Sequence, residues 1–207
     1  MGRTIICDFD GVWVDSFEVL LGINQAALAR RGKTISAEQY RAAFHGPIHH
    51  ALREQLGLDE AQQREFSEDK RRIFPDHYHA ASVSFFPFAE ALIVRLSQLG
   101  QLHVVTASPA EAVSGLLVKK GLRRYFGEVA GFSLVGKRAT LERLVAAAPD
   151  APAYFVTDTV GDVREAAGLN LKVIAVGWGF HSRAELLAAG THAVVTTADE
   201  LLERLQD

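Results

Sequence analysis

Cysteine is nearly absent from this sequence of 207 residues: Cys7 stands alone, so no disulfide can form within the chain. Long apolar runs are also missing. No segment has the length needed to cross a bilayer, and the N-terminus lacks the charged and long apolar regions of a signal peptide. We therefore expect a cytoplasmic protein that makes no contact with membranes.

The sequence also lacks an excess of basic charge. Its net charge of −3 offers no basic surface to nucleic acid, so we expect no nucleic-acid partner. The triplet Lys70-Arg71-Arg72 is too short to change this, and we interpret it as the solvated face of a helix. Hydrophobic residues at 48% and charged residues at 23% are instead typical of an ordinary globular protein.

Short apolar runs rich in β-branched residues recur along the chain, and segments with helical spacing separate them. Strands that alternate with helices predict an α/β fold with a doubly wound parallel sheet. The expected strands are residues 4–9, 102–106, 153–157, 171–176 and 193–196, and the expected helices are 89–99, 110–120, 139–148, 163–167, 183–189 and 199–205.

Residues 16–84 interrupt this alternation, because their pattern is helical throughout and includes no convincing strand. We predict a small helical cap domain at 16–84, inserted into a core domain made of 1–15 and 85–207. Ligands of open α/β sheets bind at the carboxyl ends of the strands, where such an insert would form a lid. The expected cap helices are residues 19–30, 37–44, 49–56 and 60–78.

Asp8 and Asp10 lie where the first expected strand ends, and Gly11 allows the chain to turn directly after them. Residues two apart in a strand share a face, so both carboxylates would point toward one ligand. Such a pair suits phosphoryl transfer, because one acid can attack phosphorus while the other exchanges protons.

Two more expected strands end on polar residues. Thr106 is followed by Ala107 and Ser108, and a hydroxyl beside the free amides of a helix start is a phosphate-binding arrangement; we expect Ser108 to cap that helix. Asp158 and Asp162 follow the strand at 153–157, and carboxylates that converge at strand ends can hold Mg²⁺.

Taken in order, Asp8-x-Asp10, Thr106, Lys137 and Asp158-x-x-x-Asp162 resemble the four motifs of the haloacid dehalogenase superfamily. The opening segment 8–16 and the helical insert resemble its phosphoglycolate-phosphatase-like branch. The sequence departs from that branch at Thr157, which replaces a usual Gly directly before the metal-binding Asp and would crowd the metal, and at Trp13, which replaces a Leu.

The resemblance implies a mechanism. Asp8 would form an aspartyl-phosphate and Asp10 would act as general acid and then as base. Lys137 and Thr106 would bind the phosphoryl oxygens. Asp8, the Asp10 backbone carbonyl and Asp158 would hold Mg²⁺, with Asp162 as an outer ligand.

In the expected cap, the segment 44–50 resembles the substrate-specificity loop of the branch, and we expect His45 and His49 to contact the substrate beyond its phosphate. A zinc site built from His45, His49 and His50 is an alternative, although Gly46-Pro47 breaks the helix that such ligation would use.

The function expected from these residues is a Mg²⁺-dependent phosphatase, active as a monomer or homodimer on a small phosphorylated metabolite such as phosphoglycolate or a sugar phosphate. Three alternatives stay open. One is a phosphomutase on the same scaffold, the second is a receiver-like signalling domain, and the third is a non-catalytic phosphate-binding protein.

Overall fold

The computed structural model of the chain describes residues 2–79, 81–131 and 136–206. Six parallel strands form a sheet in the order β5-β4-β1-β6-β7-β8. The fold predicted from the alternating pattern is therefore confirmed. The strands are β1 (Arg3–Cys7), β4 (Gly100–Val105), β5 (Phe126–Ala130), β6 (Ala153–Thr157), β7 (Lys172–Val176) and β8 (Ala193–Val195).

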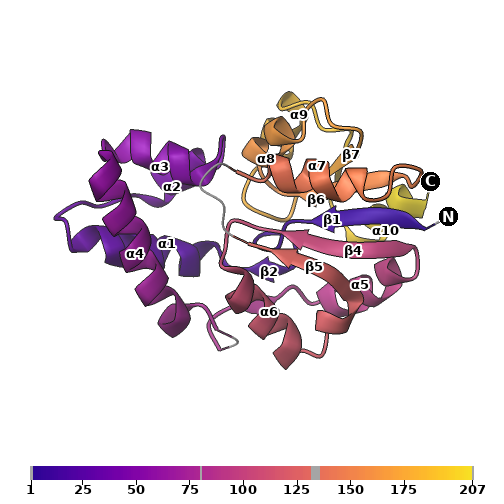
Figure 1. Ribbon diagram of the computed structural model, residues 1–207, viewed down its shortest axis with the longest axis horizontal. Coiled ribbons are helices and arrows are strands. Elements are labelled where there is room, and N and C mark those ends of the chain that lie inside the picture. The colour runs from indigo at the N-terminus through magenta and orange to yellow at the C-terminus, as the bar shows by residue number, and fades with distance from the viewer. Residues whose placement is uncertain (1, 80, 132–135, 207) are drawn as a thin grey trace.

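Helices cover both faces of this sheet because alternate strand residues point to opposite sides. Ile5 and Cys7 pack into one cluster, which also takes the apolar sides of α5, α6 and α10, whereas Ile6 packs into a second cluster with α7, α8 and α9. Figure 1 shows α7, α8 and α9 on one side of the sheet and α5 and α6 on the other. These helices are α5 (Ala89–Ser97), α6 (Ala110–Lys119), α7 (Arg138–Ala146), α8 (Val160–Glu165), α9 (Arg183–Ala188) and α10 (Ala198–Gln206), and a 3-10 turn covers Arg123–Tyr125.

The winding direction of the sheet reverses beside β1. Strands β4 and β5 are added outward on one side of β1, and β6, β7 and β8 are then added outward on its other side. In open α/β sheets, ligands bind outside the carboxyl ends of the strands at such a reversal. The ends of β1 and β6, which carry Asp8 and Asp158, are therefore the expected location of a site.

Four helices lie between the short strands β2 (Val14–Asp15) and β3 (Ser84–Phe85), which pair antiparallel. We call residues 16–83 the helical insert. Figure 1 shows it beyond the carboxyl end of the sheet, toward which the strands run. The exact two-domain boundaries predicted from the sequence stay a prediction. The helices of the insert are α1 (Phe17–Ala29), α2 (Ala37–Ala43), α3 (Ile48–Leu56) and α4 (Glu60–His77).

The insert contacts the core through the loop between α2 and α3. The Gly161 amide donates to the Phe44 carbonyl at 2.8 Å, and Arg164 Nη1 donates to the His45 carbonyl at 2.8 Å. A Cβ at residue 161 would lie 2.6 Å from the Gly46 carbonyl oxygen, so only glycine permits this approach. The loop therefore lies directly on the N-terminus of α8.

One strand of the sheet was not predicted. Strand β5 is at the sheet edge, and its residues after Phe126 are only partly buried or exposed. Gly127 and Glu128 interrupt its apolar pattern, so the sequence gives no strong strand signal.

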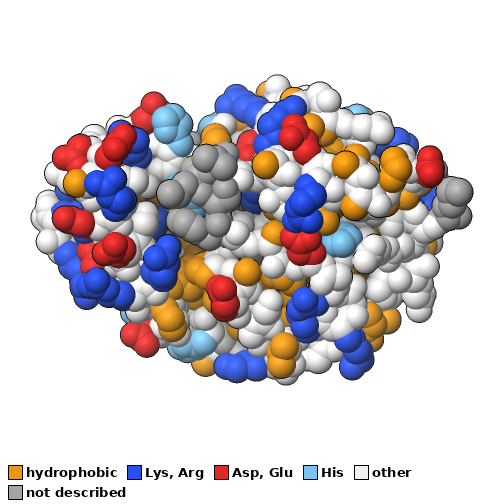
Figure 2. Space-filling view, viewed as in Figure 1, with side chains coloured by type: hydrophobic (Ala, Val, Ile, Leu, Met, Phe, Trp, Pro, Cys, Tyr) orange, Lys and Arg blue, Asp and Glu red, His pale blue; other side chains and the backbone are white. Residues whose placement is uncertain are grey.

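The surface agrees with the low net charge. On the face shown in Figure 2, acidic and basic side chains lie interspersed over the insert and the core. Within the described ranges, no helix combines the length and apolar character that a membrane crossing requires.

Candidate active site

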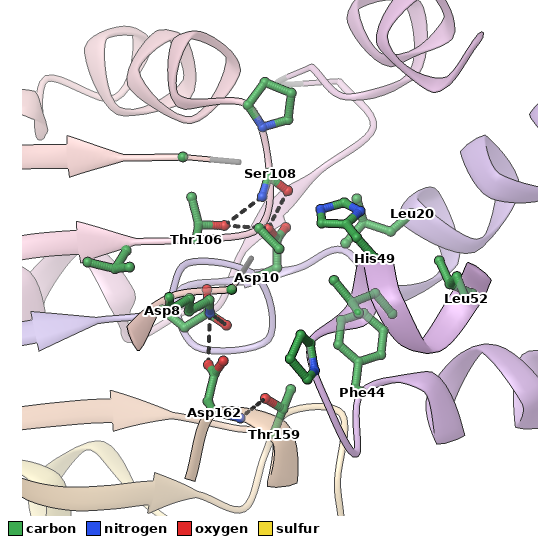
Figure 3. A pocket seen from close by; sticks show the side chains of 18 of the residues that line it. Asp8, Asp10, Leu20, Phe44, His49, Leu52, Thr106, Ser108, Thr159 and Asp162 are labelled. Carbon is green, nitrogen blue, oxygen red and sulfur yellow. Dashed lines mark hydrogen bonds and ion pairs between the residues drawn. The ribbon is translucent and has the colours of Figure 1, made fainter. Parts of the chain in front are cut away.

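A cavity of about 390 Å³ lies between the carboxyl ends of the strands and the helical insert. Figure 3 shows Asp8, Asp10 and Thr106 on the sheet side and His49 on the insert side. Most of the residues proposed from the sequence line this cavity, whereas Asp158 and His45 do not. Those that line it are Asp8, Asp10, His49, Thr106, Ala107, Ser108, Lys137 and Asp162.

Asp8, Lys137 and Asp162 form a buried charged triad. Lys137 Nζ lies 2.7 Å from Asp8 Oδ2 and 2.8 Å from Asp162 Oδ2. Burial raises the pKa of the Asp8 carboxyl well above its usual range, although Lys137 opposes this shift. Burial also opposes the charge on Lys137, but the Asp162 and Asp8 carboxylates outweigh it and raise the Lys137 pKa. The lysine is therefore a fixed cation beside Asp8.

The position of Lys137 depends on two local features. Gly136 has a φ of 91°, which favours glycine, and a Cβ there would lie 2.3 Å from Glu165 Oε2. Glu165 Oε2 in turn accepts hydrogen bonds from the backbone amides of Lys137 and Arg138. Glu165 thus fixes the start of α7, from which Lys137 extends into the cavity.

Asp10 accepts hydrogen bonds from four hydroxyl groups. Ser16 Oγ and Tyr78 OH both donate to Oδ1 at 2.6 Å. Ser108 Oγ donates to Oδ2 at 2.7 Å, and Thr106 Oγ1 donates to the same oxygen at 3.3 Å. A carboxylate has about four acceptor positions, so the Asp10 side chain is held in a single orientation.

Contrary to the prediction from the sequence, the Ser108 side chain does not cap α6. The N-cap residue of α6 is Pro109, which makes no side-chain cap, and the Ser108 hydroxyl bonds Asp10 instead. The prediction that Ser108 caps this helix is therefore wrong. Its amide donates to Thr106 Oγ1 at 3.0 Å, so the segment after β4 is folded around the Thr106 hydroxyl.

Asp158 lies outside the cavity lining and is fully buried. Its Oδ2 accepts from the Phe180 amide at 2.7 Å, whereas its Oδ1 has no hydrogen-bond partner among the described residues. Gly11 and Gly179 leave room for this carboxyl, since a Cβ at either would lie within 2.4 Å of Asp158 Oδ2. Burial raises the pKa of Asp158 to about 7.

These carboxyl groups fit a divalent cation. Asp8, Asp10, Asp158 and Asp162 are all buried, and Lys137 is the one cation that pairs with any of them in the described part of the chain. Unpaired buried carboxylates are costly, and Mg²⁺ is commonly bound by one or two carboxylates. The unbonded Asp158 Oδ1 is the oxygen that such an ion would satisfy.

Thr157 contributes to this arrangement, although the sequence suggested only that it would crowd the metal. Its Oγ1 donates to Asp162 Oδ2 at 2.6 Å and accepts from the Thr159 amide at 3.3 Å. Thr157 therefore holds Asp162 in position next to Lys137. Neither this role nor those of Ser16, Tyr78 and Glu165 was predicted, because each depends on a contact between segments distant in sequence or on a side-chain orientation.

The insert side of the cavity is largely apolar, with Leu20, Phe44 and Leu52 (Figure 3). His49 is buried there, and burial lowers its pKa to about 3, although a hydrogen bond with the Ala107 backbone opposes this shift. His49 is therefore uncharged at neutral pH.

Lys70 also lines the insert side, which corrects its interpretation as part of a solvated helix face. Its Nζ lies 4.6 Å from the centre of the Phe66 ring, and burial lowers its pKa to about 8. In the described part of the chain, no carboxylate forms an ion pair with it. The single signal in the sequence was that Lys70 lies one helical turn from Phe66, on the apolar side of α4.

The ring of His45 lies outside the cavity lining, at the junction of insert and core. Its Nε2 is 3.5 Å from Glu185 Oε1, and its ring centre is 4.6 Å from that of His181. These three side chains can bring ligand atoms together, but both His181 nitrogens are already used, by the Val160 amide and the Arg41 carbonyl. The zinc alternative of His45, His49 and His50 is not assembled among the described residues.

A family model described as haloacid dehalogenase-like hydrolase matches residues 5–176. The chain therefore belongs to the haloacid dehalogenase-like hydrolases, as its ordered motifs predicted. Phosphoglycolate phosphatase of Synechococcus elongatus is 30% identical and covers 97% of this chain and 96% of its own length. Tyrosine-protein kinase PtkA of Mycobacterium tuberculosis is 28% identical and covers 98% of this chain and 72% of its own length.

Solved structures share the fold over the whole chain. A predicted phosphatase from Clostridium acetobutylicum has a TM-score of 0.84 at 25% identity, with 100% of this chain and 99% of that one covered. A haloacid dehalogenase-like hydrolase from Streptococcus pneumoniae has a TM-score of 0.81 at 21% identity, with 99% and 98% covered. The helical insert is included in both matches, given their coverage.

Proposed function

We propose that this protein is a Mg²⁺-dependent phosphatase that hydrolyses a small phosphorylated metabolite through an aspartyl-phosphate on Asp8. The observation that carries the proposal is the buried triad in which Lys137 lies within 2.8 Å of both Asp8 and Asp162, at the floor of a cavity also lined by Asp10. A fixed ammonium beside a buried carboxylate suits stabilisation of a phosphoryl group under attack.

In the first step, an Asp8 oxygen attacks phosphorus and the bond to the ester oxygen breaks, while the Asp10 carboxyl gives that oxygen its proton. In the second step, water attacks phosphorus, Asp10 takes the proton from water, and the bond to Asp8 breaks to release phosphate. Thr106, Ser108, Ala107 and Lys137 line the space where the phosphoryl oxygens would bind.

Magnesium would be held by Asp8, Asp158 and the Asp10 backbone carbonyl, with Asp162 as an outer ligand. Its chemistry is to neutralise charge on the phosphoryl oxygens. The orphaned Asp158 Oδ1 and the excess of carboxylates over cations support this assignment.

The insert side of the cavity supports a substrate with a second negative group beyond its phosphate. Lys70 is an ammonium without a carboxylate partner in the described ranges, and it lines the same cavity as Asp8. Phosphoglycolate carries such a group in its carboxylate, and the Synechococcus elongatus relative is named for its action on it. Phosphoglycolate is therefore the first candidate, ahead of neutral sugar phosphates. We place the reaction in the cytoplasm, which the lone buried Cys7 suits.

The test is phosphate release from p-nitrophenyl phosphate with and without Mg²⁺, followed by a panel of phosphorylated metabolites at equal concentration. We expect Mg²⁺-dependent turnover and the highest kcat/KM for phosphoglycolate. Transfer of the phosphoryl group to a sugar, followed by NMR, would instead establish a phosphomutase. Phosphate binding without any turnover would establish a binding protein or a receiver-like domain.

A further inference from the structure

At each end of the four insert helices, one side chain donates a hydrogen bond to the same core atom, Asp10 Oδ1. Ser16, the residue directly before α1, donates its hydroxyl to this oxygen at 2.6 Å. Tyr78, the residue directly after α4, donates its phenol to it at 2.6 Å. The residues that flank the four helices of the insert thus meet on one carboxylate oxygen of the core.

The other oxygen of Asp10 faces the phosphate side of the cavity. Asp10 Oδ2 accepts from Thr106 and Ser108, both of which line the cavity with Asp8. Since Ser16 and Tyr78 occupy Oδ1, rotation of the carboxyl group would break their two short bonds. Oδ2 is therefore the oxygen on the cavity side, where the ester oxygen of a bound substrate would take the place of the Thr106 or Ser108 hydroxyl.

We propose that Tyr78 is a positioning residue that fixes Asp10 for proton transfer to the leaving group, and that it does so only while the helical insert is docked on the core. The inference rests on the proposed phosphatase function. Tyr78 does not line the catalytic cavity, so its effect on the reaction passes through Asp10 and not through the substrate.

The surroundings of Tyr78 suit this role. Its side chain is buried, with 3% exposed, and its ring packs on that of Phe74 at 4.5 Å between centres. Tyr78 is also the C-cap residue of α4, and its amide donates to the Phe74 carbonyl at 2.8 Å. A movement of α4 away from the core would consequently withdraw the phenol from Asp10.

The experiment compares kcat/KM for two substrates with different leaving groups. Phosphoglycolate has a poor alkoxide leaving group that needs a proton, whereas 2,4-dinitrophenyl phosphate has a good one that does not. Because kcat/KM reports only the steps up to departure of the leaving group, it isolates the acid role of Asp10 from its role as base.

Tyr78→Phe removes the hydroxyl group and is expected to lower kcat/KM for phosphoglycolate by about 10-fold to 100-fold. This loss is a part of the roughly 10²–10⁴-fold contribution of a general acid. The value for 2,4-dinitrophenyl phosphate is expected to change by less than about threefold, since that step draws little on a general acid. Ser16→Ala, which removes the second donor to the same oxygen, is expected to show the same pattern. Tyr154→Phe is the matched control, because Tyr154 is also buried but lies in β6. This substitution should leave kcat/KM unchanged for both substrates.

In an Asp10→Asn background, Tyr78→Phe should cause no further loss with phosphoglycolate. Equal losses with both substrates in Tyr78→Phe and Ser16→Ala would overturn the inference while leaving the phosphatase function intact. A wild type that turns over neither substrate would overturn the proposed function, and this inference with it. Circular dichroism and thermal unfolding show whether each variant is folded, and Ser16→Ala serves as the test if Tyr78→Phe is not.

Discussion

The two sides of the cavity differ in how their polar groups are paired. On the core side, Asp10 accepts four hydroxyl donors, and Lys137 is paired with two carboxylates. On the insert side, Lys70 lines the cavity together with Leu20, Leu52 and other residues, and it has no carboxylate partner in the described residues. The core side is therefore already organised around its own charges, whereas the insert side presents a charge to the ligand.

We infer from this difference that the core side carries out the reaction and that the insert side discriminates between substrates. Reactive groups must be held close to one geometry, and shared hydrogen bonds between buried side chains provide that. Discrimination between substrates depends instead on groups that are satisfied only when the correct ligand is bound. We therefore expect substitutions on the core side to reduce turnover of every substrate, and those on the insert side to change the preference among substrates.

The largest effect is expected from Asp8→Asn on the core side. An amide cannot form the acyl-phosphate, so turnover should be abolished with phosphoglycolate and with p-nitrophenyl phosphate. The measurement is phosphate release, with thermal unfolding as a check that the variant is folded. Retained activity on either substrate, in protein free of other phosphatases, would contradict the assignment of the nucleophile.

The second effect concerns the cation. If Mg²⁺ binds the orphaned Asp158 Oδ1, saturating Mg²⁺ should stabilise the folded protein by about 2.7 kcal/mol at one hundred times its Kd. Chelation with EDTA should remove this gain together with the activity. Asp158→Asn should unfold at the same temperature with and without Mg²⁺. Undiminished stabilisation of Asp158→Asn by Mg²⁺ would place the ion elsewhere.

The third effect tests the insert side. Lys70→Met keeps the aliphatic stem but removes the charge, so KM for phosphoglycolate should rise by about 10-fold, as expected when a charge-assisted contact worth roughly 1.5 kcal/mol is lost. KM for p-nitrophenyl phosphate should not change. Arg72→Met is the control, because Arg72 is exposed and pairs with Glu68 on the outer side of α4. Equal changes with both substrates would mean that Lys70 does not select the second anion.

The same contact predicts a pH dependence, because burial lowers the Lys70 pKa to about 8. Below this pH the ammonium is present, so KM for phosphoglycolate should be constant; above it the charge is lost and KM should rise. His49 is uncharged across this range, because burial and the nearby Lys70 charge lower its pKa to about 3. The rise should be absent in Lys70→Met.

The smallest effect distinguishes His45 from His49, the two histidines that the sequence predicted to contact the substrate. His49 lines the cavity, so His49→Ala should alter the ratio of kcat/KM between phosphoglycolate and p-nitrophenyl phosphate by several fold, about 1 kcal/mol. His45 lies outside the lining, and His45→Ala should leave this ratio within about twofold of the wild type. The reverse order of effects would show that the specificity contact is His45.

The fold and the convergence of most candidate site residues on one cavity could be predicted, because each depends on local signals. Apolar strands that end on Asp8, Thr106 and Asp158 indicate both the sheet and the edge at which the acids meet. Strand β5 escaped because an edge strand is only partly buried, and its apolar pattern is correspondingly weak.

The partners of these motifs could not be predicted, because they are set by tertiary contacts. Tyr78 lies 68 residues from Asp10 in the sequence, and nothing in its own segment indicates that its phenol reaches a core carboxylate. Lys70 has charged neighbours in Arg71 and Arg72, so the sequence favoured solvent exposure. Only the packing of Phe66 and α4 turns Lys70 inward, toward the cavity.

The contact between Gly161 and the loop after α2 uses main-chain atoms on both sides, an amide and a carbonyl. The side chain of residue 44 can therefore change without loss of this bond, as long as residue 161 remains a glycine. This one bond is therefore independent of the side chain of residue 44, whereas the hydrogen bonds of Ser16 and Tyr78 to Asp10 and the packing of Phe44 on Phe180 do depend on insert side chains. An exchange of the loop between α2 and α3 would keep this main-chain bond, whereas Gly161→Ala would place a Cβ 2.6 Å from the Gly46 carbonyl oxygen and push the loop away from α8.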